Sequence, residues 1–337
     1  MRKFASFMMC SMLASVMLIA CATASEKAAV TLKIATVHPE SSPLHQALMF
    51  FVEDLHKRTG GVVKVTVFPN SQLGNERDLA NSVLMGSVEG AMLADSVINS
   101  VDNVPAANIG SVPFLFTGSE SFFNTMDELL IEELNAQYAA IGVKNISYFH
   151  IGGNDIANSV RSIVSPDDMK GLKIRIWDNE GIYKFLAACG SSPVTMAFGE
   201  VYTAIQQGTV NGVTTNSFQF VPMKFVEVCK YHTNMKVLLN FQSLSFNKDW
   251  FDALPEDIQK AFAESGEAAY ENCRDIICPN SNARDYQAIE AAGVKVTYLT
   301  DEQRQVFIDI GSTIWGDFRS LFGAELFDRI VAISQRK

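Results

Sequence analysis

The feature that most constrains the fold is an alternation of strand and helix patterns in the first third of the chain. Residues 31–37 and 62–68 have the pattern of strands, and the second alternates strictly between apolar and polar side chains. Residues 43–61 between them predict an amphipathic helix with a Ser-Pro start and a Gly-Gly end. A helix over about 76–85 and a short apolar strand over 90–94 follow. This order is typical of an α/β protein whose parallel sheet has helices on both faces.

Two crossings of the chain divide this α/β fold into two lobes. A strand over 143–150 leads into Gly152-Gly153, which permits a change of direction, and the chain crosses back around 237–246. A long amphipathic helix follows from Pro255 to about Cys278. We therefore expect each lobe to be discontinuous in sequence. The predicted division is residues 28–150 plus about 240–275 for lobe I, and residues 151–239 plus about 276–337 for lobe II.

Residues 1–24 have the composition of a secretory signal peptide. Arg2 and Lys3 precede an apolar run over 7–20, and Ala22-Thr23-Ala24 forms an A-x-A cleavage signal. The run is shorter than the ~20 residues that a membrane-spanning helix needs. We therefore expect an exported, periplasmic protein. Leu18-Ile19-Ala20-Cys21 also resembles a lipobox, in which a lipidated Cys21 would anchor the mature chain to a membrane.

The charge balance excludes some classes of partner. The formal net charge is −10, and cleavage after Ala24 removes two positive charges and no acid, which leaves −12. Binding to nucleic acid or to anionic lipid needs a basic surface, so we expect neither partner. An anionic ligand stays compatible with the sequence, because one buried Arg sets the local potential independently of the net charge.

Four cysteines remain in the mature chain: Cys189, Cys229, Cys273 and Cys278. Cys273 and Cys278 lie five positions apart in a helical stretch, which at a rise of ~1.5 Å per residue is too far for a disulfide. A helix break before Pro279 would bring them together, so the bridged and the reduced states both stay open. The cysteine spacings and the scattered histidines are unlike a zinc site, and we expect no metal.

The stretch from Ser165 to Asn216 carries the main candidate for a binding residue. Ser165 and Pro166 predict a single helical turn that Gly171 ends, and residues 172–177 then alternate as a strand with Arg175 at the far end. In open α/β sheets, ligands gather beyond the carboxyl ends of the strands. A guanidinium there holds a carboxylate through two parallel hydrogen bonds. The alternative for a lone Arg is an ordinary surface salt bridge.

Two motifs resemble the signature of solute receptors of tripartite ATP-independent periplasmic (TRAP) transporters: GLKIR at 171–175 and FGEVYTAIQQGTVNG at 198–212. Three more match in the family's order: VFPNSQLGNERDL, VPFLF and FNKDWFDALPEDIQKAF. The resemblance covers nearly the whole mature chain. It implies a two-lobed periplasmic solute-binding fold, each lobe a mixed sheet flanked by helices, joined by hinge strands and a long spine helix. The implied partners are a small organic carboxylate and the membrane subunits of the permease, and the implied receptor is a monomer.

The resemblance also implies roles for single residues. Arg175 pairs with a ligand carboxylate in the interlobe cleft. Phe198 packs a ring against the ligand, with core packing as the alternative. Thr215 or Asn216 takes over an amide contact, because Val213-Thr214-Thr215-Asn216 replaces the family's Gln-Glu-Asn-Pro. Asp178 contacts the ligand or caps the next helix, and Trp177 shares the side of the strand that carries Arg175.

A departure from the family pattern points to the solute. Many members carry a second Arg about twenty residues before the first, whereas Asn154 or Asp155 stands there in this chain. A second carboxylate on the ligand is therefore not expected. Asp95 and Glu76 occupy positions that line the first lobe in relatives, and with Asp155 they would make the pocket acidic opposite Arg175.

One Arg facing acids suits a zwitterion, with the ligand carboxylate on the guanidinium and the ammonium on Asp95 or Asp155. We therefore expect a monocarboxylate such as an amino acid or a 2-oxo acid, with an aromatic side chain because four rings cluster near the site: Trp177, Phe198, Phe218 and Phe220. A four-carbon dicarboxylate, as bound by family members, is the alternative.

The sequence contains no nucleophile elbow, phosphate-binding loop, zinc-protease motif or cofactor fingerprint. We therefore expect no cofactor and no enzyme, but a receptor whose lobes close on the solute. A sensor subunit with the same fold, which presents the solute to a signalling partner, is the alternative.

Overall fold

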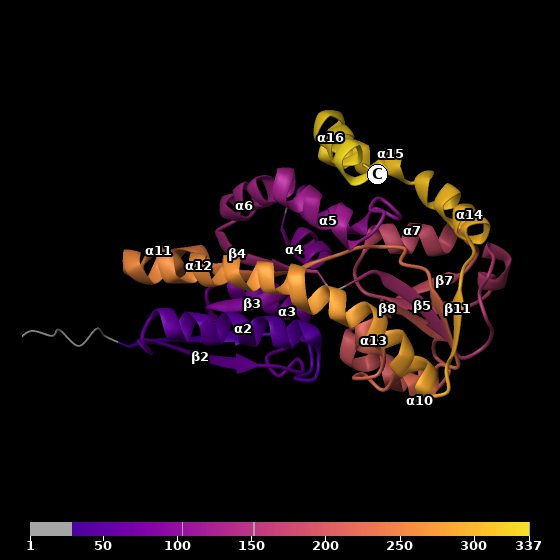
Figure 1. Ribbon diagram of the computed structural model, residues 1–337, viewed down its shortest axis with the longest axis horizontal. Coiled ribbons are helices and arrows are strands. Elements are labelled where there is room, and N and C mark those ends of the chain that lie inside the picture. Colours follow the sequence, from indigo (N-terminus) through magenta and orange to yellow (C-terminus); the bar gives the residue numbers. More distant parts are fainter. Residues whose placement is uncertain (1–28, 103, 151, 337) are drawn as a thin grey trace, which may run out of the picture.

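The computed structural model describes residues 29–102, 104–150 and 152–336, and it shows two α/β lobes (Figure 1). The predicted signal peptide and Cys21 lie outside the described residues. The first sheet, within the described chain, has the strand order β2-β1-β3-β10-β4. Its strands are β1 (Val30–Ala35), β2 (Val63–Phe68), β3 (Gly90–Ala94), β4 (Val143–Phe149) and β10 (Gln242–Asn247).

The helices of lobe I follow the predicted order. Ser42 caps the first helix, whose Pro43 stands at the first position, and Asn75 caps the next in a reciprocal capping box with Asp78. β1 pairs in parallel with β2 and β3, and β10 is antiparallel to β3 and β4. The helical elements are α2 (Pro43–Arg58), α3 (Glu76–Leu84), α4 (Asp95–Val101), η1 (Pro105–Ser111), α5 (Ser119–Thr125), η2 (Met126–Leu130), α6 (Ile131–Ala140) and α11 (Lys248–Asp252).

The second sheet has the order β11-β9-β5-β8-β6-β7 in the part of the chain that the structure describes. Its strands are β5 (Asn154–Asn158), β6 (Lys173–Ile176), β7 (Ser192–Thr195), β8 (Gly212–Asn216), β9 (Tyr231–Asn234) and β11 (Lys295–Tyr298). The short helical elements of this lobe are η3 (Pro166–Met169), α7 (Glu180–Ala188), η4 (Phe198–Glu200), α8 (Val201–Gln206), α9 (Ser217–Phe220) and α10 (Phe225–Val228). The expected α/β architecture with a mixed sheet in each lobe is thus confirmed.

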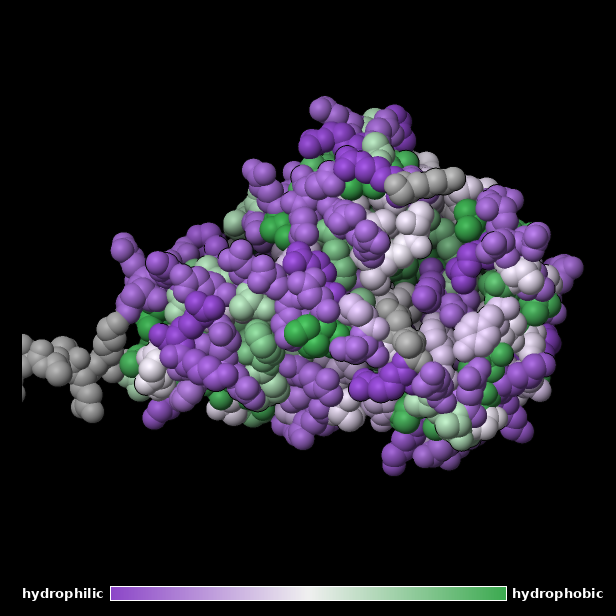
Figure 2. All heavy atoms as spheres, in the orientation of Figure 1, coloured by the Kyte–Doolittle hydropathy of each residue, from purple (hydrophilic) through white to green (hydrophobic). Residues whose placement is uncertain are grey.

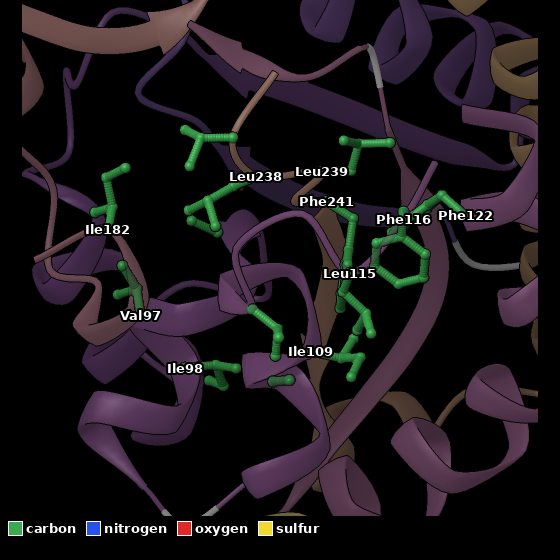
Figure 3. Packing of buried hydrophobic residues seen from close by; sticks show 14 of the residues in the cluster. Val97, Ile98, Ile109, Leu115, Phe116, Phe122, Ile182, Leu238, Leu239 and Phe241 are labelled. Atoms are coloured by element: carbon green, nitrogen blue, oxygen red, sulfur yellow. The ribbon is translucent and has the colours of Figure 1, made fainter. Parts of the chain in front are cut away.

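Two chain segments form the hinge between the lobes. Asn154 donates its backbone N–H to Leu238 O at 2.8 Å, and Val237 donates to Asn154 O at 2.8 Å. Figure 3 shows the apolar packing beside this hinge, where Leu238, Leu239 and Phe241 lie near Leu115 and Phe116. The same apolar cluster includes buried residues of both lobes, so the two lobes pack against each other beside the hinge.

The spine helix is continuous from Glu256 to Ala291, as α12 (Glu256–Asn272), the π turn η5 (Cys273–Ile277) and α13 (Cys278–Ala291). In Figure 1 this orange helix runs past both lobes. The helix break before Pro279, which the sequence left open, is therefore absent from this helix. The π turn widens the helix just ahead of the proline, which has no N–H to donate.

The thiols of the spine helix make hydrogen bonds and no disulfide. Cys273 Sγ donates to His150 O at 3.5 Å, and Cys278 Sγ donates to Ser119 Oγ at 3.5 Å. Because the helix continues, the bridged state left open by the sequence has no support.

The terminal helices are α14 (Asp301–Ser312), α15 (Trp315–Phe322) and α16 (Ala324–Ser334). α14 packs on α7 of lobe II, but α16 contacts α5 of lobe I (Figure 1). Phe327 and Ile330 of α16 are buried in the large apolar cluster, and Gln335 Nε2 donates to Leu115 O at 2.5 Å. The prediction that the terminal helices complete lobe II is therefore wrong for α16, because its apolar stripe finds its partner on the other lobe.

Hydrophilic side chains cover most of the face in Figure 2, with hydrophobic residues scattered among them. Within the described residues, every helix is too short or too polar to cross a bilayer.

Candidate functional site

A cavity lies between the two lobes, where the carboxyl ends of strands from both sheets meet. Lobe I contributes the loop after β1 and the start of α3, and lobe II contributes β6, β8 and the loop before α8. The empty space amounts to about 560 Å³, which includes space open to the solvent. The cavity is therefore the candidate binding site.

Arg175 is the buried cation of this cavity, with 3% of its surface exposed. β6 lies between β7 and β8 and carries Arg175 as its third residue. The Nε and Nη2 groups donate to Met196 O at 3.0 and 2.8 Å, and the ring of Phe198 lies 5.5 Å from Cζ. Within the described residues, no carboxylate lies close enough to form an ion pair with the guanidinium. The surface salt bridge that the sequence left open for Arg175 is therefore not formed with any of the described residues.

Burial lowers the pKa of Arg175 to about 10, and the charges of Glu76 and Glu200 act against this shift. The guanidinium therefore stays protonated at neutral pH. A buried charge without an ionic partner is costly, so the cavity favours an anion that pairs with it.

Seven of the predicted site residues line the cavity together. They are Arg175, Phe198, Trp177, Thr215, Asn216, Asn154 and Glu76. Asn216 Nδ2 donates to Gly152 O at 2.9 Å, and Asn154 Nδ2 donates to Asn240 Oδ1. These contacts orient both amides beside the hinge. Trp177 Nε1 donates to Ser96 Oγ at 3.0 Å, a bond from lobe II to lobe I.

Asp155 is a predicted site residue that lies outside the cavity. Its carboxylate accepts hydrogen bonds from four donors: the backbone N–H groups of Met235 and Lys236, Nε2 of His232 and the hydroxyl of Tyr286. Successive residues of a strand point to opposite faces, so Asp155 faces α13 because its neighbour Asn154 faces the cavity. The prediction that Asp155 meets the ligand is wrong.

Asp95 and Asp178 also lie outside the cavity. Asp95 opens α4 and is fully buried, and its carboxylate accepts from the backbone N–H groups of Ser96 at 2.7 Å and Phe241 at 3.4 Å. Asp178 forms an ion pair with Arg77 at 2.5 Å near the surface, and Asn179 rather than Asp178 caps α7. The acids that the sequence assigns to the pocket are thus bonded elsewhere, to backbone N–H groups and to a surface Arg. Neither Asp95 nor Asp155 is therefore placed to bind a ligand ammonium, and Glu76 is the acid among the described lining residues.

Besides Thr214 and Asn240, three polar residues that the sequence reasoning missed line the cavity: His38, Gln219 and Gln242. All three are at least nine-tenths buried. They come from the loop after β1, from α9 and from the start of β10. His38 follows the carboxyl end of a predicted strand, a position from which it could have been predicted as a binding residue. Gln219 and Gln242 had no comparable signal.

Glu76 is the acid of the cavity. It is half-buried at the first position of α3, and burial raises its pKa to about 7, while the charge of Arg175 and the amide of Gln242 oppose the shift. Burial also lowers the pKa of His38 to about 4, so this imidazole is neutral at neutral pH. Among the described lining residues, Arg175 is the one permanent cation.

Comparison with known proteins agrees with this geometry. Residues 34–321 match the family model of the bacterial extracellular solute-binding proteins, family 7 (DctP). The chain belongs to this family. Its members are solute-binding proteins of TRAP transporters and not enzymes, so the recognition made from the sequence motifs is confirmed.

Several relatives of this family 7 protein have a named solute. The 2,3-diketo-L-gulonate-binding periplasmic protein YiaO of Escherichia coli is 28% identical over 285 residues, which are 85% of each chain. A TRAP periplasmic solute-binding protein from Roseobacter denitrificans, solved with β-D-glucuronate, is 26% identical with a TM-score of 0.83 over 91% of this chain and 99% of that one. One from Sulfurospirillum deleyianum, solved with succinate, is 25% identical with a TM-score of 0.84 over 91% and 99%.

The lobes of this family 7 protein meet at the cleft mouth beside the cavity. Arg77 of α3 pairs with Asp178 of lobe II, and Ser96 of α4 donates to Asp178 O at 2.9 Å. The bond from Trp177 to Ser96 lies next to them. These contacts join the lobes beside the cavity.

Proposed function

We propose that this family 7 protein is the extracytoplasmic receptor for a sugar acid, a small organic acid with one carboxylate and several hydroxyl groups. It would hold the solute between its lobes and deliver it to the membrane subunits of a TRAP permease. The observation that carries the proposal is the buried Arg175, which has no carboxylate partner among the described residues.

Arg175 supports a carboxylate in the site for a physical reason. Met196 O accepts hydrogen bonds from Nε–H and from one N–H of Nη2, and Arg175 lines the cavity with its other N–H groups free for a further acceptor. A planar guanidinium binds a carboxylate by two parallel charge-assisted bonds. A solute that brings this carboxylate also neutralises a charge that burial makes costly.

The charge count supports a single carboxylate. Arg175 is the one permanent cation of the described lining, His38 is neutral, and Glu76 adds a negative charge as the pH rises through about 7. A second carboxylate would meet Glu76 without a cation of its own. The rest of the lining is neutral, and its amides and imidazole suit hydroxyl groups.

The named solutes of relatives fit a sugar acid. The Roseobacter protein was solved with glucuronate, and YiaO is named for diketogulonate, both of which are sugar acids. The succinate complex of the Sulfurospirillum protein favours a four-carbon dicarboxylate as the second candidate. The amino acid considered from the sequence has less support, because Asp95 and Asp155 are bonded elsewhere in the protein.

Isothermal titration of the mature protein with D-glucuronate, D-gluconate, succinate and amino acids tests the proposal. A sugar acid at a hundred times its dissociation constant should also add ~2.7 kcal/mol to the free energy of unfolding in a thermal-shift assay. Arg175→Ala and Arg175→Lys should both lose the binding, since Lys lacks the planar fork. Arg319→Ala is the matched control, because Arg319 pairs with Asp328 on the surface.

Two results would overturn the proposal. If succinate binds and no sugar acid does, the dicarboxylate alternative is correct. If a sugar acid binds equally well without the Arg175 side chain, the carboxylate does not lie on this residue.

A further inference from the structure

We propose that His38, Gln219 and Gln242 form a hydroxyl-binding subsite in the cavity, which selects solutes that carry hydroxyl groups beyond the carboxylate. We call these three residues the hydroxyl subsite. The proposal rests on the function proposed above and extends it, since it assigns the residues that decide between hydroxylated and bare carboxylic acids.

The polar atoms of the hydroxyl subsite support this proposal. Four of them are enclosed and make no hydrogen bond of good geometry within the described residues, although Gln219 and Gln242 lie close enough to the imidazole of His38 to act on its pKa: Nδ1 and Nε2 of His38, Oε1 of Gln219 and Oε1 of Gln242. Most buried polar atoms in proteins are bonded, and each exception needs an explanation. Four such atoms on the lining of one cavity point to bonds made with a ligand.

The position of these residues also supports the proposal. They come from three segments that are far apart in the sequence, and the side chains of Gln219 and Gln242 both lie beside the imidazole of His38. All three line the same cavity as Arg175. A solute whose carboxylate lies on Arg175 therefore has its remaining atoms within the space that the hydroxyl subsite borders.

The chemistry of the atoms favours a hydroxyl group. The neutral imidazole of His38 has one donor nitrogen and one acceptor nitrogen, and each free amide oxygen is an acceptor. The amide of Gln242 is engaged with Glu76, which leaves its Oε1 for other donors. A hydroxyl group both donates and accepts, so it satisfies every atom of this set. A carboxylate has no proton to donate, and a methylene group makes no hydrogen bond.

Two isosteric variants test the subsite. Gln219→Met and Gln242→Met keep an unbranched side chain of similar length and remove the amide. Titration of each with D-gluconate should show about a tenfold weaker dissociation constant, the effect of one lost buried hydrogen bond. The dissociation constant for hexanoate, which has the same chain length and no hydroxyl group, should change less than twofold.

The controls separate this effect from a general loss of structure. Gln305→Met removes an amide that contacts Asp309 on the surface, and it should bind gluconate like the wild type. Far-UV circular dichroism and thermal melting report whether each variant is folded. Because Gln219 lies in α9 and Gln242 in β10, a folding failure of one variant leaves the other as the test.

The outcomes distinguish the subsite from the proposed function. If gluconate binds in an Arg175-dependent way and both Met variants keep the same preference for gluconate over hexanoate, the hydroxyl subsite is wrong and the function stands. If only the melting temperature of the variants changes, the three residues are structural, and the subsite is again wrong. If no sugar acid binds the wild type, the proposed function fails and the subsite fails with it.

Discussion

Replacing Glu76 by Gln should stabilise the ligand-free protein at pH 8 and leave its stability nearly unchanged at pH 4. Burial raises the pKa of Glu76 from 4.5 to about 7. A carboxyl group whose pKa is higher in the folded state than in the unfolded state favours folding while it is protonated. This contribution is fully present below the unfolded pKa of 4.5 and is lost as the pH rises through about 7.

The magnitude follows from the size of the shift. The two pKa values differ by about 2.5 units, and each unit corresponds to about 1.4 kcal/mol, so the ionised Glu76 costs roughly 3 kcal/mol at pH 8. Gln has nearly the same shape as a protonated Glu and cannot ionise. The Glu76→Gln variant should therefore gain about 3 kcal/mol in the free energy of unfolding at pH 8.

Urea denaturation at pH 4 and pH 8, followed by tryptophan fluorescence, measures both values. Glu325→Gln makes the same chemical change at an exposed position of α16, and it serves as the control. A gain of equal size at both pH values would refute the reasoning, since it could not come from ionisation. A loss of stability at pH 8 would also refute it, because Glu76 would then act mainly as the partner of Arg175.

Three further predictions concern residues that do not line the cavity. Asp155→Asn should lower the free energy of unfolding by about 3 kcal/mol in urea denaturation, because the buried carboxylate serves four donors, and unchanged stability would contradict this. Gly266→Ala should cost about 1–3 kcal/mol in the same assay, since a Cβ there would overlap Ile146 O, whereas a neutral effect would mean that the spine helix shifts freely. Arg77→Ala should change stability by less than about 1 kcal/mol, because the ion pair with Asp178 is half exposed, yet speed solute release in stopped-flow measurements; an unchanged release rate would show that the pair does not hold the cleft closed.

Much of the architecture could be predicted from the sequence because its signals are local. The strand and helix patterns between residues 30 and 94 are set by the spacing of apolar side chains, and caps such as Ser42 and Asn75 mark where helices begin. Arg175 could be identified by its place at the end of a strand within a family motif. These features need no knowledge of distant contacts.

The predictions that failed depend on contacts between remote segments. Nothing local shows whether Asn154 or Asp155 faces the cavity, since the choice follows from which sheet face α13 covers. Likewise, the carboxylate of Asp95 accepts a hydrogen bond from the backbone N–H of Phe241, which lies far away in the sequence. α16 packs on lobe I because a complementary apolar surface exists there only after the chain has folded.

The sequence by itself thus determined the class of fold, the family and Arg175, the cation to which we assign the solute carboxylate. Only the tertiary structure decided what surrounds that cation. His38, Gln219 and Gln242 meet in one cavity because three segments converge between the lobes. The acids expected there, Asp95 and Asp155, instead accept hydrogen bonds from other groups of the protein. The physical reason is that secondary structure follows from neighbouring residues, whereas the polarity of a cavity follows from which buried groups find partners elsewhere.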